Sequence, residues 1–193
     1  MARLLTTTAL VAVGLAIAPI GFAQTSQPTA PGHAAPATAA KDTVNHEDKL
    51  FVKEAAMGGM AEVELSKIGQ KSENPDVKSF ADRMVRDHTA ANAELTAAAV
   101  STGLDAEMPK ALDSQHERLR DKLQTLHGKA FDEQYIHAMV EDHNKAVKLF
   151  QQEERSGHSA QLKQFAQKTL PTIEEHQKMA VDLSHRLAQT AAR

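Results

Sequence analysis

A nine-residue pattern occurs twice in this chain and limits how its helices can be arranged. Residues 80–88 and 135–143 both contain an aromatic residue, a Met-Val pair and an Asp-His pair, in the same order. The two copies lie 55 positions apart, and an alanine follows three positions after each histidine. A pattern repeated once in a small domain predicts two similar helices placed as counterparts. Each copy carries an acid and a metal-capable imidazole among apolar residues, so it is also the first indication of function.

The chain after residue 44 has the composition and periodicity of helices. Ala, Leu, Lys, Glu and Gln predominate, and no stretch alternates convincingly with the two-residue period of a strand. The expected helices cover residues 45–71, 75–103, 109–127, 130–155 and 160–190. Pro171 lies inside the last of them, where its missing N–H predicts a kink or bulge rather than an end.

Capping residues support these limits. Asn74 can cap the second helix, with Pro75 at the first helical position, and Ser159 can cap the last. Gly103 is expected to stop the second helix, and Gly128 the shorter third one.

Short turns join the long helices in pairs. Residues 72–75 and 156–159 allow little more than a reversal of the chain, which predicts two antiparallel hairpins. Residues 104–128 are long enough to cross from one hairpin to the other. The sequence therefore predicts an all-α domain over 44–193. This domain is expected to be a four-helix bundle of two antiparallel hairpins, joined by a crossover that contains a shorter fifth helix.

Residues 1–23 are predicted to be a signal peptide cleaved after Ala23. Arg3 gives a short positive region, an apolar run covers residues 9–20, and a small-x-small pattern follows it. The run is too short to favour a permanent membrane span, and a buried N-terminal helix is the weaker alternative. Residues 24–43 are rich in Pro, Ala and Thr, which predicts a flexible tether.

The chain contains no cysteine, which excludes disulfides, thiolate metal sites and cysteine nucleophiles. It also excludes a lipid-modified cysteine at the cleavage point, so we expect an exported, periplasmic product without a lipid anchor. Without residues 1–23 the chain has 21 basic and 25 acidic residues. A net charge of −4 argues against binding to nucleic acid.

Each long helix offers at least one ionisable residue to the interior when positions are counted at 100° per residue. His176 falls near the centre of its apolar face, the two Asp-His pairs flank theirs, and Glu62 stands among small residues. Inward imidazoles and carboxylates from facing helices are how bundles bind iron, manganese, zinc or copper. The candidate metal ligands are Glu62, Asp87, His88, Asp142, His143 and His176.

A packing role for these groups is the alternative. A buried Asp-His pair can satisfy itself by hydrogen bonds and set helix register without a metal. The Glu-x-x-His signature of di-iron bundles is missing, because Val85, Val140 and Ile173 stand three positions before the three histidines. Two pairs, Asp113 with His116 and Asp182 with His185, have a loose Asp-x-x-His spacing but lie outside the repeat.

Four groups of residues mark the domain from end to end. They are Ala56-Met57-Gly58-Gly59-Met60-Ala61-Glu62-Val63, Val77-Lys78-Ser79-Phe80-Ala81 with Met84-Val85-Arg86-Asp87-His88, Phe131-Asp132-Glu133-Gln134-Tyr135 with Met139, Val140 and His143, and Leu170-Pro171 with His176. With them, the stretch 51–187 resembles the bacterial envelope family known as domain of unknown function 4142, whose members are often labelled predicted outer-membrane proteins. The resemblance implies a ferritin-like helical bundle in the cell envelope, and it implies no particular reaction.

The residues and the resemblance together predict an exported periplasmic or envelope protein, with a non-catalytic binding or stress-related role. We assign no catalytic residue and expect no nucleic-acid partner. No transmembrane segment is expected after cleavage, so any association with the outer membrane would be peripheral. The alternative function is a ferritin-like protein that binds Fe, Mn, Cu or Zn through inward His, Asp and Glu side chains.

Overall fold

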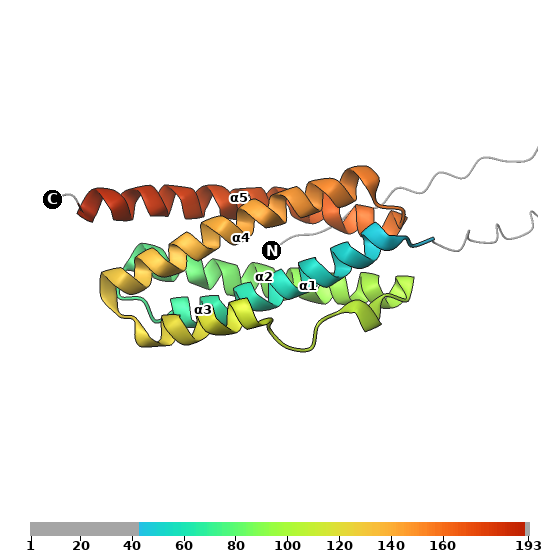
Figure 1. Ribbon diagram of the computed structural model, residues 1–193. Coiled ribbons are helices and arrows are strands. Elements are labelled where there is room, and N and C mark those ends of the chain that lie inside the picture. Colours follow the sequence, from blue (N-terminus) through green and yellow to red (C-terminus); the bar gives the residue numbers. More distant parts are fainter. Residues whose placement is uncertain (1–42, 192–193) are drawn as a thin grey trace, which may run out of the picture. The chain divides into compact units, whose positions relative to one another are not determined.

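The computed structural model describes residues 43–191, and this part of the chain is helical, without a strand (Figure 1). Its elements are α1 (His46–Gly69), α2 (Pro75–Thr102), the 3-10 helix η1 (Asp105–Glu107), α3 (Ser114–Thr125), α4 (Gly128–Ser156) and α5 (Ala160–Ala191). The predicted fold class is confirmed. The predicted signal peptide (1–23) and all but the last residue of the predicted tether (24–43) lie outside the described residues. Of the helices in 43–191, none is long and apolar enough to cross a membrane.

The four long helices form a bundle in which neighbouring helices run antiparallel (Figure 1). α1 packs against α2 and α4 packs against α5, while contacts of α1 with α4 and of α2 with α5 close the bundle. Asp48, in the first turn of α1, accepts hydrogen bonds at Oδ1 from the backbone N–H groups of His158 and Ser159, which directly precede α5. These bonds show that α1 and α5 start at the same end of the bundle. It follows that α2 and α4, which carry the repeat, run parallel on a diagonal of the bundle.

Side-chain caps begin α1, α2 and α5, and the caps of α2 and α5 are those that the sequence predicts. Asn45 and Asp48 form a capping box at the start of α1. Asn74 Oδ1 accepts a hydrogen bond from the backbone N–H of Asp76 at the start of α2. Ser159 Oγ accepts one from the backbone N–H of Leu162 at the start of α5. These side chains satisfy N–H groups that a helix leaves without a partner at its first turn.

Two glycines in the left-handed region shape the crossover. Gly103 ends α2 with φ of 73°, as expected. The expectation for Gly128 is wrong in detail, because α3 already ends at Thr125 and Gly128 opens α4 with φ of 52°. The chain reverses there through a conformation that a residue without a Cβ adopts at little cost. α5 continues through Pro171 without ending.

Two apolar clusters fill the bundle, with a polar layer between them. The first cluster takes from the four long helices, among others, Leu65, Met84, Met139 and Ala180. The second takes Ala55, Leu95, Phe150 and Ile173. Each of the four long helices places one polar residue between its residues of the two clusters, and these residues form the layer: Glu62, His88, His143 and His176.

Candidate metal centre

Each long helix places one buried polar side chain in the layer between the apolar clusters. Glu62 on α1 and His88 on α2 are 3% exposed, while His143 on α4 and His176 on α5 are 0% exposed. Apolar residues one turn away on the same faces pack inward and carry these groups with them. The structure therefore brings together four of the six residues that the sequence proposed as ligands.

The three imidazole rings face one another in this layer. The ring centroids of His88 and His176 are 5.2 Å apart, and His143 lies 5.5 Å from each. One nitrogen of each ring can be chosen so that the three lie within 4.8 Å of one another. Such atoms lie no more than about 2.8 Å from a shared centre, compared with about 2.0–2.1 Å for a Zn–N bond. Small side-chain rotations would therefore suffice for all three to bind one ion.

One nitrogen of each ring faces an acceptor. His143 Nδ1 lies 2.9 Å from the backbone oxygen four residues earlier, and His176 Nε2 lies 3.0 Å from Asp87 Oδ2. His88 Nδ1 lies 3.0 Å from Glu62 Oε2. Each neutral ring donates its one proton to this acceptor and keeps its lone pair on the other nitrogen.

The remaining nitrogens are the unusual feature of the layer. Within the described residues, His88 Nε2, His143 Nε2 and His176 Nδ1 are buried and have no hydrogen-bond partner. A buried polar atom without a partner costs about 1–3 kcal/mol, so such atoms are rare in folded proteins. Histidines that bind metals have this arrangement, with an acceptor holding one nitrogen and the metal on the other. The donor set therefore fits a transition-metal ion.

Charge coupling determines which groups are ionised. Burial raises the pKa of Glu62, but electrostatic interactions with His88 and His143 and a hydrogen bond from His88 outweigh it and bring this pKa to about 2. Burial lowers the pKa of His88, but the charge of Glu62 outweighs it and the net pKa is raised. Burial and repulsion from His88 lower the pKa of His176 to about 4. At pH 7 the layer thus holds an ionised carboxylate beside a neutral His176, whose lone pair is available to a metal.

Asp87 stands behind His176 rather than at the centre. Its Oδ2 lies 3.0 Å from His176 Nε2 and 3.2 Å from Arg83 Nε. Arg83 also forms a bidentate pair with Glu175, at N–O distances of 2.9 and 2.6 Å. Burial raises the pKa of Asp87, but the hydrogen bonds from His176 and Arg83 outweigh it and lower the net pKa. An ionised carboxylate at this place fixes the orientation of His176.

Asp142 occupies the same position as Asp87 in the repeat but lies away from the three histidines. Its Oδ1 pairs with Lys145 Nζ at 3.1 Å, and its Oδ2 lies 3.9 Å from Nε2 of His116 on α3. His116 Nδ1 lies 3.0 Å from Asp113 Oδ1. The crossover therefore adds a histidine that sequence spacing left outside the candidate set.

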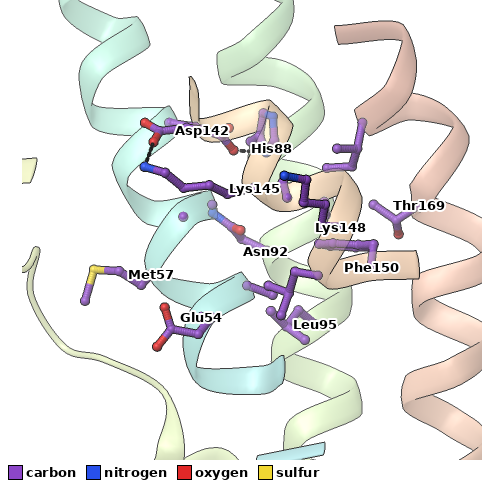
Figure 2. Close-up of a pocket in the computed structure, with 18 of the residues that line it drawn as sticks. Glu54, Met57, His88, Asn92, Leu95, Asp142, Lys145, Lys148, Phe150 and Thr169 are labelled. Atoms are coloured by element: carbon purple, nitrogen blue, oxygen red, sulfur yellow. Dashed lines mark hydrogen bonds and ion pairs between the residues drawn. The ribbon is translucent and has the colours of Figure 1, made fainter. Parts of the chain in front are cut away.

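A cavity of about 520 Å³ connects this outer group with the inner layer (Figure 2). Glu62 and His88 line its buried side, and Asp142, His116 and Lys145 line its more exposed side. Figure 2 shows the ion pair of Lys145 with Asp142, and His88 among the labelled residues that line the cavity. The layer is thus accessible from one side of the bundle.

Comparison with known proteins gives a family. The family described as Domain of unknown function (DUF4142) matches residues 33–183. The chain belongs to this family. The comparison with curated proteins gives no match.

Two solved structures share the fold of this DUF4142 chain. A DUF305 fragment from Deinococcus radiodurans is 15% identical, with a TM-score of 0.63, over 74% of this chain and 98% of that one. A Streptomyces coelicolor structure described as "putative secreted protein DUF305" is 17% identical, with a TM-score of 0.60, over 77% of this chain and 96% of that one. At these identities the likeness shows the helical fold alone.

The DUF4142 chain also buries a pair of acids that the sequence reasoning missed. Asp48 is 0% and Glu153 is 2% exposed, at the end of the bundle where α1 and α5 start. Burial and the negative charge of Asp48 raise the pKa of Glu153 to about 8. The available signal was the position of Glu153 three residues after the buried Phe150, which places it on the inner face of α4.

Proposed function

We propose that this protein is an exported, non-catalytic binding protein of the cell envelope that holds one divalent transition-metal ion between His88, His143 and His176. One observation carries the proposal. Three histidines from three helices each bury an unpartnered nitrogen in one layer, and each holds an acceptor with its other nitrogen. A packing role leaves these three buried nitrogens without a partner, which is costly. One nitrogen of each ring lies within 4.8 Å of the other two, so an ion between the rings would bind all three histidines.

The ligand set limits which ions suit the site. Imidazole nitrogen binds zinc, copper, iron and nickel well. The carboxylate of Glu62 lies on the Nδ1 side of His88 and His143, where it orients the rings for binding through Nε2. Glu62 Oε1 is buried, without a hydrogen bond among the described residues, and lies 3.3 Å from His143 Nδ1. Three imidazoles with one carboxylate or water are the ligands of a four-coordinate site. A single inward carboxylate is too few for the carboxylate-bridged di-iron chemistry of ferritin-like enzymes.

The location is proposed from the amino-terminal sequence. Residues 1–23 have the charge, apolar run and small residues of a signal peptide. The Streptomyces coelicolor structure that shares the fold is described as a "putative secreted protein". A histidine site without cysteine suits an oxidising compartment, because its ligands do not form disulfides there.

The packing role remains the competing hypothesis, because Glu62, Asp87 and the histidines already form pairs within the bundle. In that case the layer between two apolar clusters would only set the register of the helices. Purified, tag-free chain incubated with Zn²⁺ or Co²⁺ and then dialysed separates the two. We expect one ion per chain and a raised melting temperature. The double variant His88→Ala with His143→Ala should lose the ion and remain helical.

Two exposed histidines supply the matched control. His137 and His185 lie on the outer surfaces of α4 and α5. The double variant His137→Ala with His185→Ala should keep one ion per chain. Substoichiometric metal in the wild type with no change in melting temperature would rule out the metal function and leave the packing role.

A further inference from the structure

We propose that Asp142 and His116 form an outer cation-binding site, at which a divalent ion is captured before it passes through the cavity to the histidines. The inference rests on the proposed function of the inner layer. It assigns a role to a side chain of the repeat and to a histidine of the crossover, neither of which lies among the three inner histidines.

The geometry of the outer pair fits a shared ion. Asp142 Oδ2 and His116 Nε2 are 3.9 Å apart, which is too long for a hydrogen bond. Two ligands of one tetrahedral ion with bonds of about 2.0–2.1 Å lie about 3.3 Å apart, so a small movement of either side chain would suffice. The neighbouring Asp113 Oδ1 lies 3.0 Å from His116 Nδ1, on the opposite side of the ring. The two atoms are not aligned as a hydrogen bond, so His116 Nδ1, like the free nitrogens of the inner histidines, is buried without a hydrogen-bond partner among the described residues.

Lys145 occupies the outer site in the absence of a cation. Its Nζ lies 3.1 Å from Asp142 Oδ1, while 64% of the lysine side chain is exposed. An exposed lysine pair of this kind contributes little stability, and its ammonium can turn into solvent. A divalent ion can therefore displace it without rearrangement of the backbone.

The cavity then leads inward to unpartnered ligands. Glu62 and His88 line it, and Glu62 Oε1 and His88 Nε2 are both buried without a hydrogen-bond partner in the described part of the chain. Charged residues along the cavity comprise four acids and two lysines, namely Glu54, Glu62, Asp113, Asp142, Lys145 and Lys148. Negative lining of a cleft concentrates cations and speeds their association.

Asymmetry between the two copies of the repeat shows why this side is the open one. Asp87 is held by Arg83 and His176, so its corner of the bundle is occupied. Asp142, at the equivalent position, meets Lys145 and the crossover histidine His116 beside the cavity. One copy of the acid thus orients an inner ligand, and the other is available to an incoming ion.

Rates of uptake test the route. Co²⁺ is mixed with metal-free, tag-free chain at low ionic strength, and its visible absorption is followed with time. We expect Asp142→Asn to slow uptake about tenfold, the lower end of electrostatic effects on association, with one ion per chain bound at the end. Asp182→Asn is the matched control, because Asp182 also pairs with a lysine on its own helix and is exposed outside the cavity. It should load at the wild-type rate.

A larger side chain in the cavity gives a second test of the route without any change of charge. A Cβ on Gly58 would meet no atom within 4 Å, and Gly58 lines the cavity. Gly58→Leu should fill part of the route and slow uptake, whereas Gly58→Ala should leave the rate unchanged. Circular dichroism confirms that both variants remain helical.

The outcomes separate the route from the function. If the wild type loads fully and Asp142→Asn and Gly58→Leu load at its rate, the route is wrong and the inner site stands. If Asp142→Asn loses the ion at equilibrium, Asp142 is a ligand of the inner site and the outer site is wrong. If the wild type takes up no Co²⁺, the proposed function fails and the route fails with it.

Discussion

Glu62 Oε2 lies 3.0 Å from Nδ1 of His88, and each side chain is only 4% exposed. Each group shifts the pKa of the other towards the charged form, against the effect of burial. A charge left without its partner in such a place is costly, because water no longer solvates it. This pair therefore links the folding of the layer to pH, in the absence of any metal.

Replacing Glu62 by Gln keeps its size and removes its charge. We expect the free energy of unfolding of the metal-free chain to fall by about 3 kcal/mol near pH 5.5, because loss of one partner of a buried pair costs about 3–5 kcal/mol and the amide keeps a hydrogen bond. Urea unfolding measures the difference. A loss below about 0.5 kcal/mol would show that the pair contributes little to stability.

The pH dependence of that difference follows from the two pKa values. The pKa of Glu62 is lowered from 4.5, so its contribution is present above pH 4.5 and is lost as the pH falls towards 2. The pKa of His88 is raised from 6.5, so its contribution is present below pH 6.5 and is lost as the pH rises through the folded value. The effect of Glu62→Gln should therefore be largest between pH 4.5 and 6.5. An effect that is constant from pH 3 to 9 would contradict this coupling.

Asp87→Asn tests whether the acid behind His176 acts on metal binding. Loss of a carboxylate that orients a metal-bound histidine weakens metal binding by about 10–100-fold. We expect a weakening of that size in Zn²⁺ competition assays, with one ion still bound at saturation. Glu175→Gln is the control, because Glu175 touches Arg83 at the surface and no inner histidine. Equal affinities for Asp87→Asn and the wild type would remove Asp87 from the site.

Glu153→Gln should change the pH dependence of stability at the other end of the bundle. The pKa of Glu153 is raised from 4.5 to about 8, so the wild type loses stability as the pH rises through this range. The glutamine variant lacks this loss, so its stability relative to the wild type should increase between pH 5 and pH 9. Thermal melting at the two pH values measures it. Glu133→Gln, at an exposed position on the same helix, should melt in parallel with the wild type.

Gly157→Ala should destabilise the turn between α4 and α5. A Cβ at Gly157 would overlap the carboxylate of Glu153 and lie 2.7 Å from the Glu153 backbone oxygen. The backbone atom cannot turn aside, so we expect a loss of about 1–3 kcal/mol in urea unfolding. Gly58→Ala has open space around its Cβ within a helix and should gain about 0.5–1 kcal/mol. Similar effects of the two changes would contradict this steric explanation.

Much of the architecture could be predicted from residues close together in the sequence. Asn45, Asn74 and Gly103 act locally, within one turn of a helix, so their capping roles were predictable. Gly128 was misplaced, because a glycine that ends one helix and one that begins the next have the same local appearance. Helical periodicity also indicated the inner faces of α2, α4 and α5, and less clearly that of α1, and His176 is buried as that periodicity predicted.

Roles within the candidate site depended on contacts between distant residues. Asp87 and Asp142 occupy the same position in the two copies of the repeat, and helical periodicity places both at the margin of an apolar face. Their partners differ because Asp87 meets His176 of α5, whereas Asp142 meets His116 of α3 beside the cavity. The place of His116 beside Asp142 also depends on tertiary packing, because α3 does not carry the repeated pattern that marked the other candidates.

The sequence by itself determined the helices, their buried faces and the set of imidazoles that those faces carry, because these follow from periodicity over a few residues. Only the tertiary structure decided which ring nitrogen each acceptor holds and which nitrogens of His88, His143 and His176 remain unpaired. Those facts depend on side-chain directions and on the diagonal placement of α2 and α4, which arise when four helices pack together. The proposed metal site therefore depends on the packed bundle, whereas the presence of a histidine on the buried faces of α2, α4 and α5 depends on the individual helix.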